Sequence, residues 1–433
     1  MRGTKFSEQN NEDVAGGYMS KSFSSDYNFK VKDSVIGAQM LFVAFGALVL
    51  VPLLTGLDPN VALFTAGAGT IIFQIVTRGK VPVFLASSFA FIAPIQYGAK
   101  TWGIPATLCG LVAAGAVYIA LSFIIRVKGS GFLSKYLPPV VTGPVIMVIG
   151  LVLAPIAVGM ATGDIGDGRI VGNQALIISM TALVTTVIVS IFGKGMLRLI
   201  PILCGIAAGY IVSLLFGAVD FSPVAKADWI KIPEFVTPQW NLNAIIYILP
   251  VAIAPAIEHF GDVLAIGAIS GKDYIKNPGV QNTMLGDGIA TSFASFLGGP
   301  PNTTYSEVTG AVALTKTFNP AVMTWAAICA VCLSFVGKLG ALLATIPSPV
   351  MGGIMILLFG MITVIGIKSL LKLKDDIIMP RNLIIISLVL VCGIGGMKLT
   401  AGQFSIEKIG LAGILGIVLN IILPGKADKS SKK

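Results

Sequence analysis

Apolar stretches follow one another along almost the whole chain. A bilayer core is about 30 Å thick, and an α-helix needs about 20 apolar residues to cross it. Only 12% of the 433 residues are charged and 55% are hydrophobic, whereas soluble domains carry about 25% charged residues. Because backbone polar groups must pair internally in lipid, such segments form helices. The sequence therefore predicts an all-α polytopic membrane protein.

Fourteen apolar segments are expected to cross the membrane. Three of them, centred at Phe89, Ala290 and Glu307, are the weakest in hydropathy. Most of the 30 Lys and Arg residues fall in the two tails and in the loops on the side of the N-terminus. Because cytoplasmic loops carry the excess of Lys and Arg, both termini are predicted to be cytoplasmic (N-in, C-in). The net charge of +10 thus reflects orientation in the membrane, and no nucleic-acid partner is expected.

Both ends of the chain are polar. Residues 1–34 have no apolar signal region and are expected to form a cytoplasmic N-terminal tail, and residues 425–433 a cytoplasmic C-terminal tail. All five cysteines fall in apolar stretches. Cys329 and Cys332 have the spacing of a redox or metal pair, but neither a second pair nor a nearby His accompanies them. Helix packing is the favoured interpretation, and no metal site is predicted.

Two segments are interrupted rather than continuously apolar. Pro82 opens Val83–Pro94, and Pro300-Pro301 opens Asn302–Thr309; each pattern predicts a short extended piece followed by a half helix. Extended backbone at membrane depth survives only where it is buried in protein or lines a cavity. Interrupted segments at matching positions of two halves point to a transporter's binding site. These are segments 3 and 10, which indicates two sets of seven with the second set inverted; two ordinary re-entrant loops are the alternative.

Carboxylates accompany these interruptions. Glu258 lies in the apolar stretch Ile245–Leu264 beside His259, the only histidine of the chain, and Glu307 lies in the second interrupted segment. A carboxylate near the bilayer midplane is costly unless it faces a partner, a cavity or a substrate. The pattern is typical of a transporter with a polar site between helices.

Several motifs carry a family resemblance, and they stand in order along the chain: Phe45-Gly46-Ala47 with Val51-Pro52, Ser87–Ile92 with Pro94, Glu258-His259 with Gly261, Pro301–Tyr305 with Glu307, and Pro347 with Pro349–Gly353. With these motifs the chain, from about Val35 to Pro424, resembles the nucleobase/ascorbate transporters (nucleobase–cation symporter-2), and among them the bacterial uracil permeases.

The resemblance implies an architecture and a mechanism. Its 7+7 inverted repeat would form a core domain from residues 35–128 (segments 1–4) and 240–346 (segments 8–11), and a gate domain from residues 129–220 (segments 5–7) and 347–424 (segments 12–14). Substrate would bind between the two short β-strands of segments 3 and 10, facing the gate. The resemblance also implies a homodimer through the gate domain, and proton-coupled import across the bacterial cytoplasmic (inner) membrane, with the proton as coupling ion and no cofactor.

Site residues follow from the same resemblance. Uracil has two N–H donors and two carbonyl acceptors, which suit carboxylates and backbone N–H groups. The resemblance assigns the ring N–H groups to Glu258 and Glu307, the carbonyls to the backbone N–H groups of Phe89 and Ser306, and stacking to Phe89 or Tyr305. Ala47 completes the expected substrate contacts.

The chain also departs from the uracil type. Asp262 stands where uracil permeases usually have histidine, and Asp262 and Asp287 resemble the xanthine and urate carriers. Those carriers usually have Gln-Asn where this chain has Glu307-Val308. Ser306 replaces a glycine that is common in the uracil type. Uracil is the favoured substrate, and xanthine or another purine is the alternative.

The polar residues have alternative interpretations. We expect Glu258, Asp262 and Glu307 to share coupling protons, although Asp262 could instead cap a broken helix; a sodium-coupled variant has no readable ion site. His259 points about 100° away from Glu258 on a helix and is expected to pack or hydrogen-bond beside the site. Asp287, between two glycines, is either a supporting residue or a turn. Phe89 is either a substrate contact or core packing.

Other function classes fit less well. Two carboxylates argue against an inorganic-anion carrier of the same fold. A membrane enzyme would need a nucleophile–base pair or metal ligands, which one His and scattered Cys do not supply. The chain has no GxxxxGK[ST] loop for ATP, and occluded carboxylates disfavour a channel. The sequence thus predicts a secondary transporter and not an enzyme.

Overall fold

A computed structural model describes residues 26–129, 131, 136–166, 168, 170–195, 197–401 and 404–424. The predicted C-terminal tail and residues 1–25 of the predicted N-terminal tail lie outside these ranges. The rest of the N-terminal tail contacts the helices, since Phe29 stacks on Trp325 at 4.5 Å between ring centroids and the Trp325 indole N–H donates to the Lys30 carbonyl at 3.0 Å. Phe29 and Lys30 thus hold the last residues of the predicted N-terminal tail against α14 (Ala321–Ser334).

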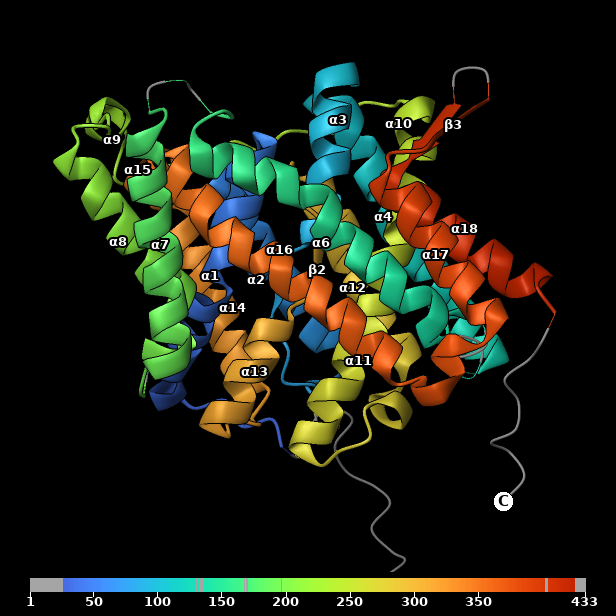
Figure 1. Ribbon diagram of the computed structural model, residues 1–433. Helices are drawn as coiled ribbons and strands as arrows, with labels where there is room; N and C mark the ends of the chain where they lie inside the picture. The colour runs from blue at the N-terminus through green and yellow to red at the C-terminus, as the bar shows by residue number, and fades with distance from the viewer. Residues whose placement is uncertain are drawn as a thin grey trace, which may run out of the picture.

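Helices make up most of the fold (Figure 1). Within the described ranges, seven helical spans are long and apolar enough to cross a membrane: α1 (Ser34–Thr55), α2 (Pro59–Val76), α4 (Ile104–Lys128), α6 (Pro139–Thr162), α7 (Asn173–Phe192), α16 (Ser348–Leu371), and α10 (Leu242–Ile248) continued by α11 (Ile253–Ser270). Shorter helices accompany them: α3 (Ile92–Trp102), α8 (Pro201–Leu215), α12 (Val280–Phe296), α13 (Ser306–Thr315), α14 (Ala321–Ser334), α15 (Gly337–Ala344), α17 (Pro380–Ile394) and α18 (Lys408–Ile422). The multi-pass helical class is confirmed; fourteen spans and the inverted repeat stay predictions.

The two interrupted segments form a buried ribbon. Strand β1 (Leu85–Ser87) pairs antiparallel with β2 (Asn302–Thr304), with Ala86 opposite Thr303. Each strand leads into a helical piece: a 3-10 turn at Phe89–Phe91 and then α3 after β1, and α13 after β2. The expected pattern of extended piece plus half helix is confirmed.

Neighbouring helices satisfy the free edges of this ribbon. The Leu85 N–H donates to the Thr70 hydroxyl of α2 at 2.9 Å, and the Thr291 hydroxyl of α12 donates to the Asn302 carbonyl at 2.7 Å. Extended backbone inside a membrane protein requires such partners, because lipid offers none. The ribbon therefore lies inside the helix packing.

The helices associate in two groups. In one group, α12 packs against α2 and α4, and α14 against α1 and α2. In the other, α16 packs against α6 and α7, and α17 against α6 and α18; α6 and α16 run side by side across the middle of Figure 1. Each group combines helices from both halves of the chain, as the predicted core and gate domains require. The domain boundaries themselves stay a prediction.

Two glycines allow the closest approach in the second group. A Cβ on Gly353 would lie 2.1 Å from the Ser179 carbonyl oxygen of α7, and one on Gly352 would lie 2.3 Å from the Ala161 nitrogen of α6. Both distances are far below van der Waals contact. The Gly352-Gly353 pair thus lets α16 touch α6 and α7 backbone to backbone, which is how small residues stabilise helix association in membranes.

A second hairpin was not predicted. Strands β3 (Lys398–Ala401) and β4 (Phe404–Glu407) pair antiparallel between α17 and α18, at the upper right of Figure 1. The expected all-α gate with strands only in segments 3 and 10 is corrected here. Residues 398–400 and 404–407 alternate polar and apolar side chains, a strand period that a hydropathy window averages away.

Candidate substrate site

One face of α11 lines a cavity beside the end of the ribbon. Glu258, Gly261, Asp262 and Ala265 have the spacing of a single helix face and border a cavity of about 510 Å³. The opposite wall comes from the start of α6 and the end of α16, where Lys368 and Lys372 stand exposed. The cavity therefore lies between the two helix groups, with carboxylates on one wall and lysines at its edge.

Asp262 joins α11 to the second half of the ribbon. Its carboxylate accepts hydrogen bonds from the Ser306 hydroxyl at 2.5 Å and from the Thr304 hydroxyl at 3.2 Å. Asp262 lies in the interior of α11, so it does not cap the end of a broken helix. Ser306 begins α13 and also borders the cavity. The end of β2 and the start of α13 are thus held against α11 by one carboxylate.

His259 and Asp287 lie behind this wall. His259 Nδ1 is 2.8 Å from Asp287 Oδ2, and its Nε2 is 2.9 Å from the Thr283 hydroxyl; both partners belong to α12. Asp287 Oδ2 also accepts from the Thr304 N–H at 3.1 Å. Asp287 is inside α12 rather than in a turn. Both residues support β2, and neither borders the cavity.

The structure separates Glu307 from Ser306. Glu307 borders a second cavity of about 240 Å³, between α1 and α13 on one side and α7, α8 and α16 on the other. Glu258 and Glu307 therefore face different cavities. The carboxylates of α11 still lie near enough to Glu307 to interact with it electrostatically.

Aromatic side chains meet where the two strands end. The Phe89 ring lies 6.4 Å from the ring of Tyr305 and 6.4 Å from that of Phe359. Phe89 is 9% exposed, and Ala47 of α1 is fully buried. Phe359 comes from α16, on the other side of the interface between the groups. The sequence analysis missed Phe359, because its apolar segment gives no sign that it faces the ribbon.

Other residues at the site were also missed. Thr283 and Thr304 hold the supporting hydrogen bonds, and Thr142 and Ser369 border the large cavity and are 3.1 Å apart between their hydroxyl oxygens. Thr304 could have been found, since it precedes Ser306 by two positions in a polar run. Thr142 and Ser369 sit in ordinary apolar segments, so only the packing of α6 on α16 shows that they meet.

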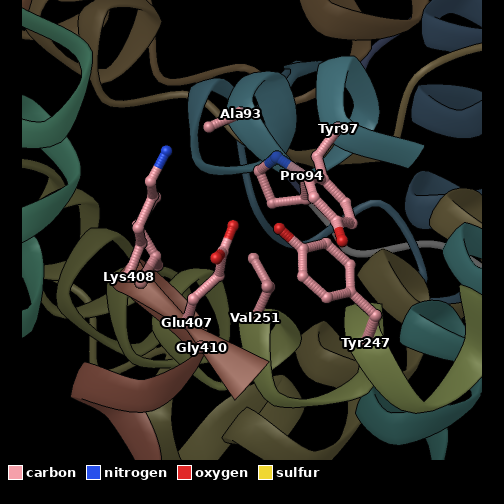
Figure 2. Close-up of a pocket in the computed structure, with 9 residues that line it drawn as sticks. Ala93, Pro94, Tyr97, Tyr247, Val251, Glu407, Lys408 and Gly410 are labelled. Carbon is pink, nitrogen blue, oxygen red and sulfur yellow. The ribbon is translucent and has the colours of Figure 1, made fainter. Parts of the chain in front are cut away.

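The opposite side of the same interface is closed. There, a pocket of only about 20 Å³ separates α3 and α10 from the start of α18, room for about one water. Figure 2 shows the Glu407 carboxylate directed toward the Tyr247 hydroxyl, which donates a hydrogen bond to it. The Tyr247 ring stacks on that of Tyr97 with centroids 4.6 Å apart. The interface is thus open at α11 and shut at Glu407.

Known proteins resemble this chain over nearly its full length. A family profile described as "Permease family" matches residues 31–402. A "Probable uracil permease" of Pasteurella multocida (strain Pm70) is 57% identical over 91% of this chain and 94% of its own length. The "Uracil permease" of Bacillus caldolyticus is 45% identical over 90% of this chain and 92% of its own, and that of Escherichia coli (strain K12) is 39% identical over 89% and 90%.

Solved structures share the fold. The transmembrane domain of the cyanobacterium bicarbonate transporter BicA superimposes with a TM-score of 0.61 over 90% of this chain and 97% of that one, at 14% identity. The structure of SLC26A9 gives 0.65 over 91% of this chain and 66% of its own, at 13% identity. At such identity the likeness concerns the fold alone. The family profile and the permease relatives settle the class: the chain is a multi-pass transporter, not an enzyme, and belongs to the nucleobase/ascorbate transporter family.

Proposed function

We propose that this protein imports a nucleobase, above all uracil, across the bacterial cytoplasmic membrane as a proton-coupled secondary transporter. The observation that carries the proposal is the wall formed by Glu258, Asp262 and Ser306 on a cavity of about 510 Å³ beside the paired strands. The extensive identity with uracil permeases supports uracil as the substrate.

The chemistry of the wall suits a flat ring with N–H and carbonyl groups. The Glu258 carboxylate can accept a ring N–H, and the backbone N–H of Ser306, in the first turn of α13, has no carbonyl of its own helix to pair with and can donate to a substrate carbonyl. Hydrogen bonds to a charged group contribute about 1.5–3 kcal/mol each. The rings of Phe89 and Tyr305 close the end of the ribbon and offer a stacking face.

Proton coupling is supported by the absence of a direct ion pair between Glu258, Asp262 or Glu307 and a Lys or Arg side chain in the described part of the chain. Carboxylates taken out of water without a cationic partner are least costly when protonated. A proton bound with the substrate would therefore lower the charge that has to cross the membrane.

The two ends of the interface support alternating access. The cavity is open beside Lys368 and Lys372, residues expected on the cytoplasmic side, and the interface is closed at Glu407 on the other side. We assign this conformation to the inward-facing state, in which substrate leaves to the cytoplasm. A homodimer through the gate domain belongs to the same proposal.

Purine transport is the competing outcome. Asp287, one of the two residues that resemble xanthine and urate carriers, is occupied by His259 and Thr304 and does not reach the cavity. Asp287 therefore supports strand β2, and its resemblance to the purine carriers does not favour a purine as the substrate.

Purified protein in liposomes provides the test. Radiolabelled uracil uptake, driven by an inward proton gradient, is measured with unlabelled uracil, thymine, xanthine, hypoxanthine or urate as competitors. We expect uracil to compete most strongly, and collapse of the gradient to abolish accumulation. Accumulation of xanthine without any uptake of uracil would overturn the substrate, and accumulation that ignores the gradient would overturn the coupling.

A further inference from the structure

The second cavity gives Glu307 a surrounding of its own. Apart from Glu307, its polar lining consists of Thr186 and Ser190 of α7 and of Arg198, which precedes α8. The remaining lining is apolar or glycine: Phe42, Val43, Leu199, Ile200, Pro201, Ile202, Leu203, Gly310, Ala311, Leu314, Leu357 and Met361. None of these residues borders the cavity that contains Glu258.

Helix geometry explains why Glu307 turns away from its neighbour. Glu307, Gly310, Ala311 and Leu314 are spaced by three, four and seven positions, and all border the second cavity; such residues share one helix face. Ser306 is displaced from Glu307 by about 100° around the helix and borders the first cavity. The first turn of α13 therefore presents one residue to each cavity.

The second cavity reaches the surface past polar groups. Ser190 and Arg198 are exposed, whereas Glu307 is half-buried. The Ser190 hydroxyl donates to the Thr186 carbonyl at 2.7 Å, and the Thr186 hydroxyl to the Ala182 carbonyl at 2.8 Å. Their oxygens keep lone pairs that accept from water. Water inside the cavity thus has hydrogen-bond partners among the lining residues.

The charges around Glu307 differ on its two sides. Glu258 and Asp262 of α11 face it from the ribbon side, and the Tyr305 ring precedes it in the chain. Among the described residues, Arg198 is the only cation in the cavity lining, while α1, α8 and α16 contribute only apolar side chains to it. A carboxylate that loses its proton here is repelled by the carboxylates of α11.

We propose that the coupled proton leaves Glu307 through this second cavity, separately from the substrate, which leaves through the first. The O–H bond of the Glu307 carboxylic acid breaks, a water of the cavity takes the proton, and the carboxylate remains on Glu307. The inference rests on the proposed function. It adds the route by which the proton leaves and places the exposed Arg198 where that route opens. Substrate and proton would then be released by different openings of one inward-facing state.

Two glycines offer a matched test. Gly310 borders the second cavity and Gly261 the first, and a Cβ at either position meets nothing within 4 Å. Gly310→Leu should therefore fill the proton route, and Gly261→Leu the substrate route, without a clash. When the pH is equal on both sides, exchange of external labelled uracil for internal uracil requires the carrier to cross only in its loaded form, so no proton has to be released. Net uptake requires release of the proton.

We expect Gly310→Leu to lose gradient-driven uptake and the uracil-induced acidification reported by a pH dye inside the liposomes, while exchange persists. Gly261→Leu should lose exchange and net uptake together. The inference would be overturned if Gly310→Leu lost exchange and net uptake equally while uracil still stabilised the protein thermally. It would also be overturned if Gly310→Leu acidified the liposomes at the wild-type rate. A wild-type protein that transports no nucleobase would instead overturn the proposed function.

The exposed residues Arg198 and Lys368 provide a second pair of matched variants, for which smaller effects are expected. Arg198→Gln should slow acidification and change the pH dependence of net uptake with uracil affinity unchanged, whereas Lys368→Gln, at the edge of the first cavity, should leave the ratio of protons to uracil and the pH profile as in the wild type. Indistinguishable pH profiles for the two variants would count against a separate proton route.

Discussion

His259 Nδ1 and Asp287 Oδ2 lie 2.8 Å apart, each residue 1% exposed, and join α11 to α12 directly behind strand β2. The same Asp287 oxygen accepts from the Thr304 N–H. Because the strand is three residues long, it has few bonds of its own to fix its position. The pair therefore sets where the substrate wall stands relative to the helices.

Asp287→Ala should accordingly destabilise the fold rather than alter substrate choice. Removing the Asp287 carboxylate leaves the His259 ring nitrogen and the Thr304 N–H without this buried hydrogen-bond partner, and a buried polar group without a partner costs about 1–3 kcal/mol. Thermal unfolding in detergent is the measurement, and Asp287→Asn, which keeps an oxygen for Thr304, should recover part of the loss. Wild-type stability of Asp287→Ala would contradict this role.

Glu258→Gln should abolish accumulation of uracil and weaken its binding. The carboxylate is the acceptor proposed for a ring N–H, and replacing a charged by a neutral hydrogen bond loses about 1.5 kcal/mol or more, roughly tenfold in affinity. Uptake into liposomes and thermal stabilisation by uracil measure the two effects.

The matched control is Glu234→Gln. Glu234 is a glutamate on the surface, with its side chain 69% exposed and paired with Lys231 at 2.5 Å. The Glu234→Gln variant should transport uracil at the wild-type rate, because exposed ion pairs contribute little to stability. Unimpaired uptake by Glu258→Gln would remove Glu258 from the site.

Asp262→Asn is expected to change the pH dependence of uptake more than uracil binding. Asparagine keeps one oxygen for the Ser306 or Thr304 hydroxyl, but it can no longer gain or lose a proton. Ser306→Ala removes one hydrogen bond from the Asp262 carboxylate but keeps the titratable group, so its uptake should still respond to pH. A large loss of binding with an unchanged profile in Asp262→Asn would make Asp262 a direct ligand or an anchor.

Local patterns predicted the parts of this site, and packing decided how they face one another. Prolines marked both interrupted segments, and helix periodicity put Asp262 on the face of Glu258. The spacing within one segment holds no information on which side chains of another segment it meets, so neither the partner of His259, 28 positions along the chain, nor the approach of Phe359 was predictable. The resemblance grouped Glu258 with Glu307; the structure gives each a different cavity because consecutive residues of α13 point apart.

The closed end of the interface yields the last prediction. Tyr247 belongs to the predicted core domain and Glu407 to the predicted gate domain, so their hydrogen bond (Figure 2) must break if the two domains separate there. Tyr247→Phe removes the donor and keeps the stacking on Tyr97. Losing a hydrogen bond to a charged group costs about 1.5 kcal/mol or more, which would raise the population open on this side roughly tenfold.

Val251 is 3% exposed in the pocket beside this pair and serves as the reporter. Val251→Cys should react with an impermeant maleimide added outside whole cells several times faster when combined with Tyr247→Phe than alone, and the wild type supplies the background of the native cysteines. Uracil uptake shows that the double variant remains folded. Equal labelling rates with and without the Tyr247 hydroxyl would mean that the contact does not hold the outer side shut, because a bond that restrains opening must change its frequency when removed.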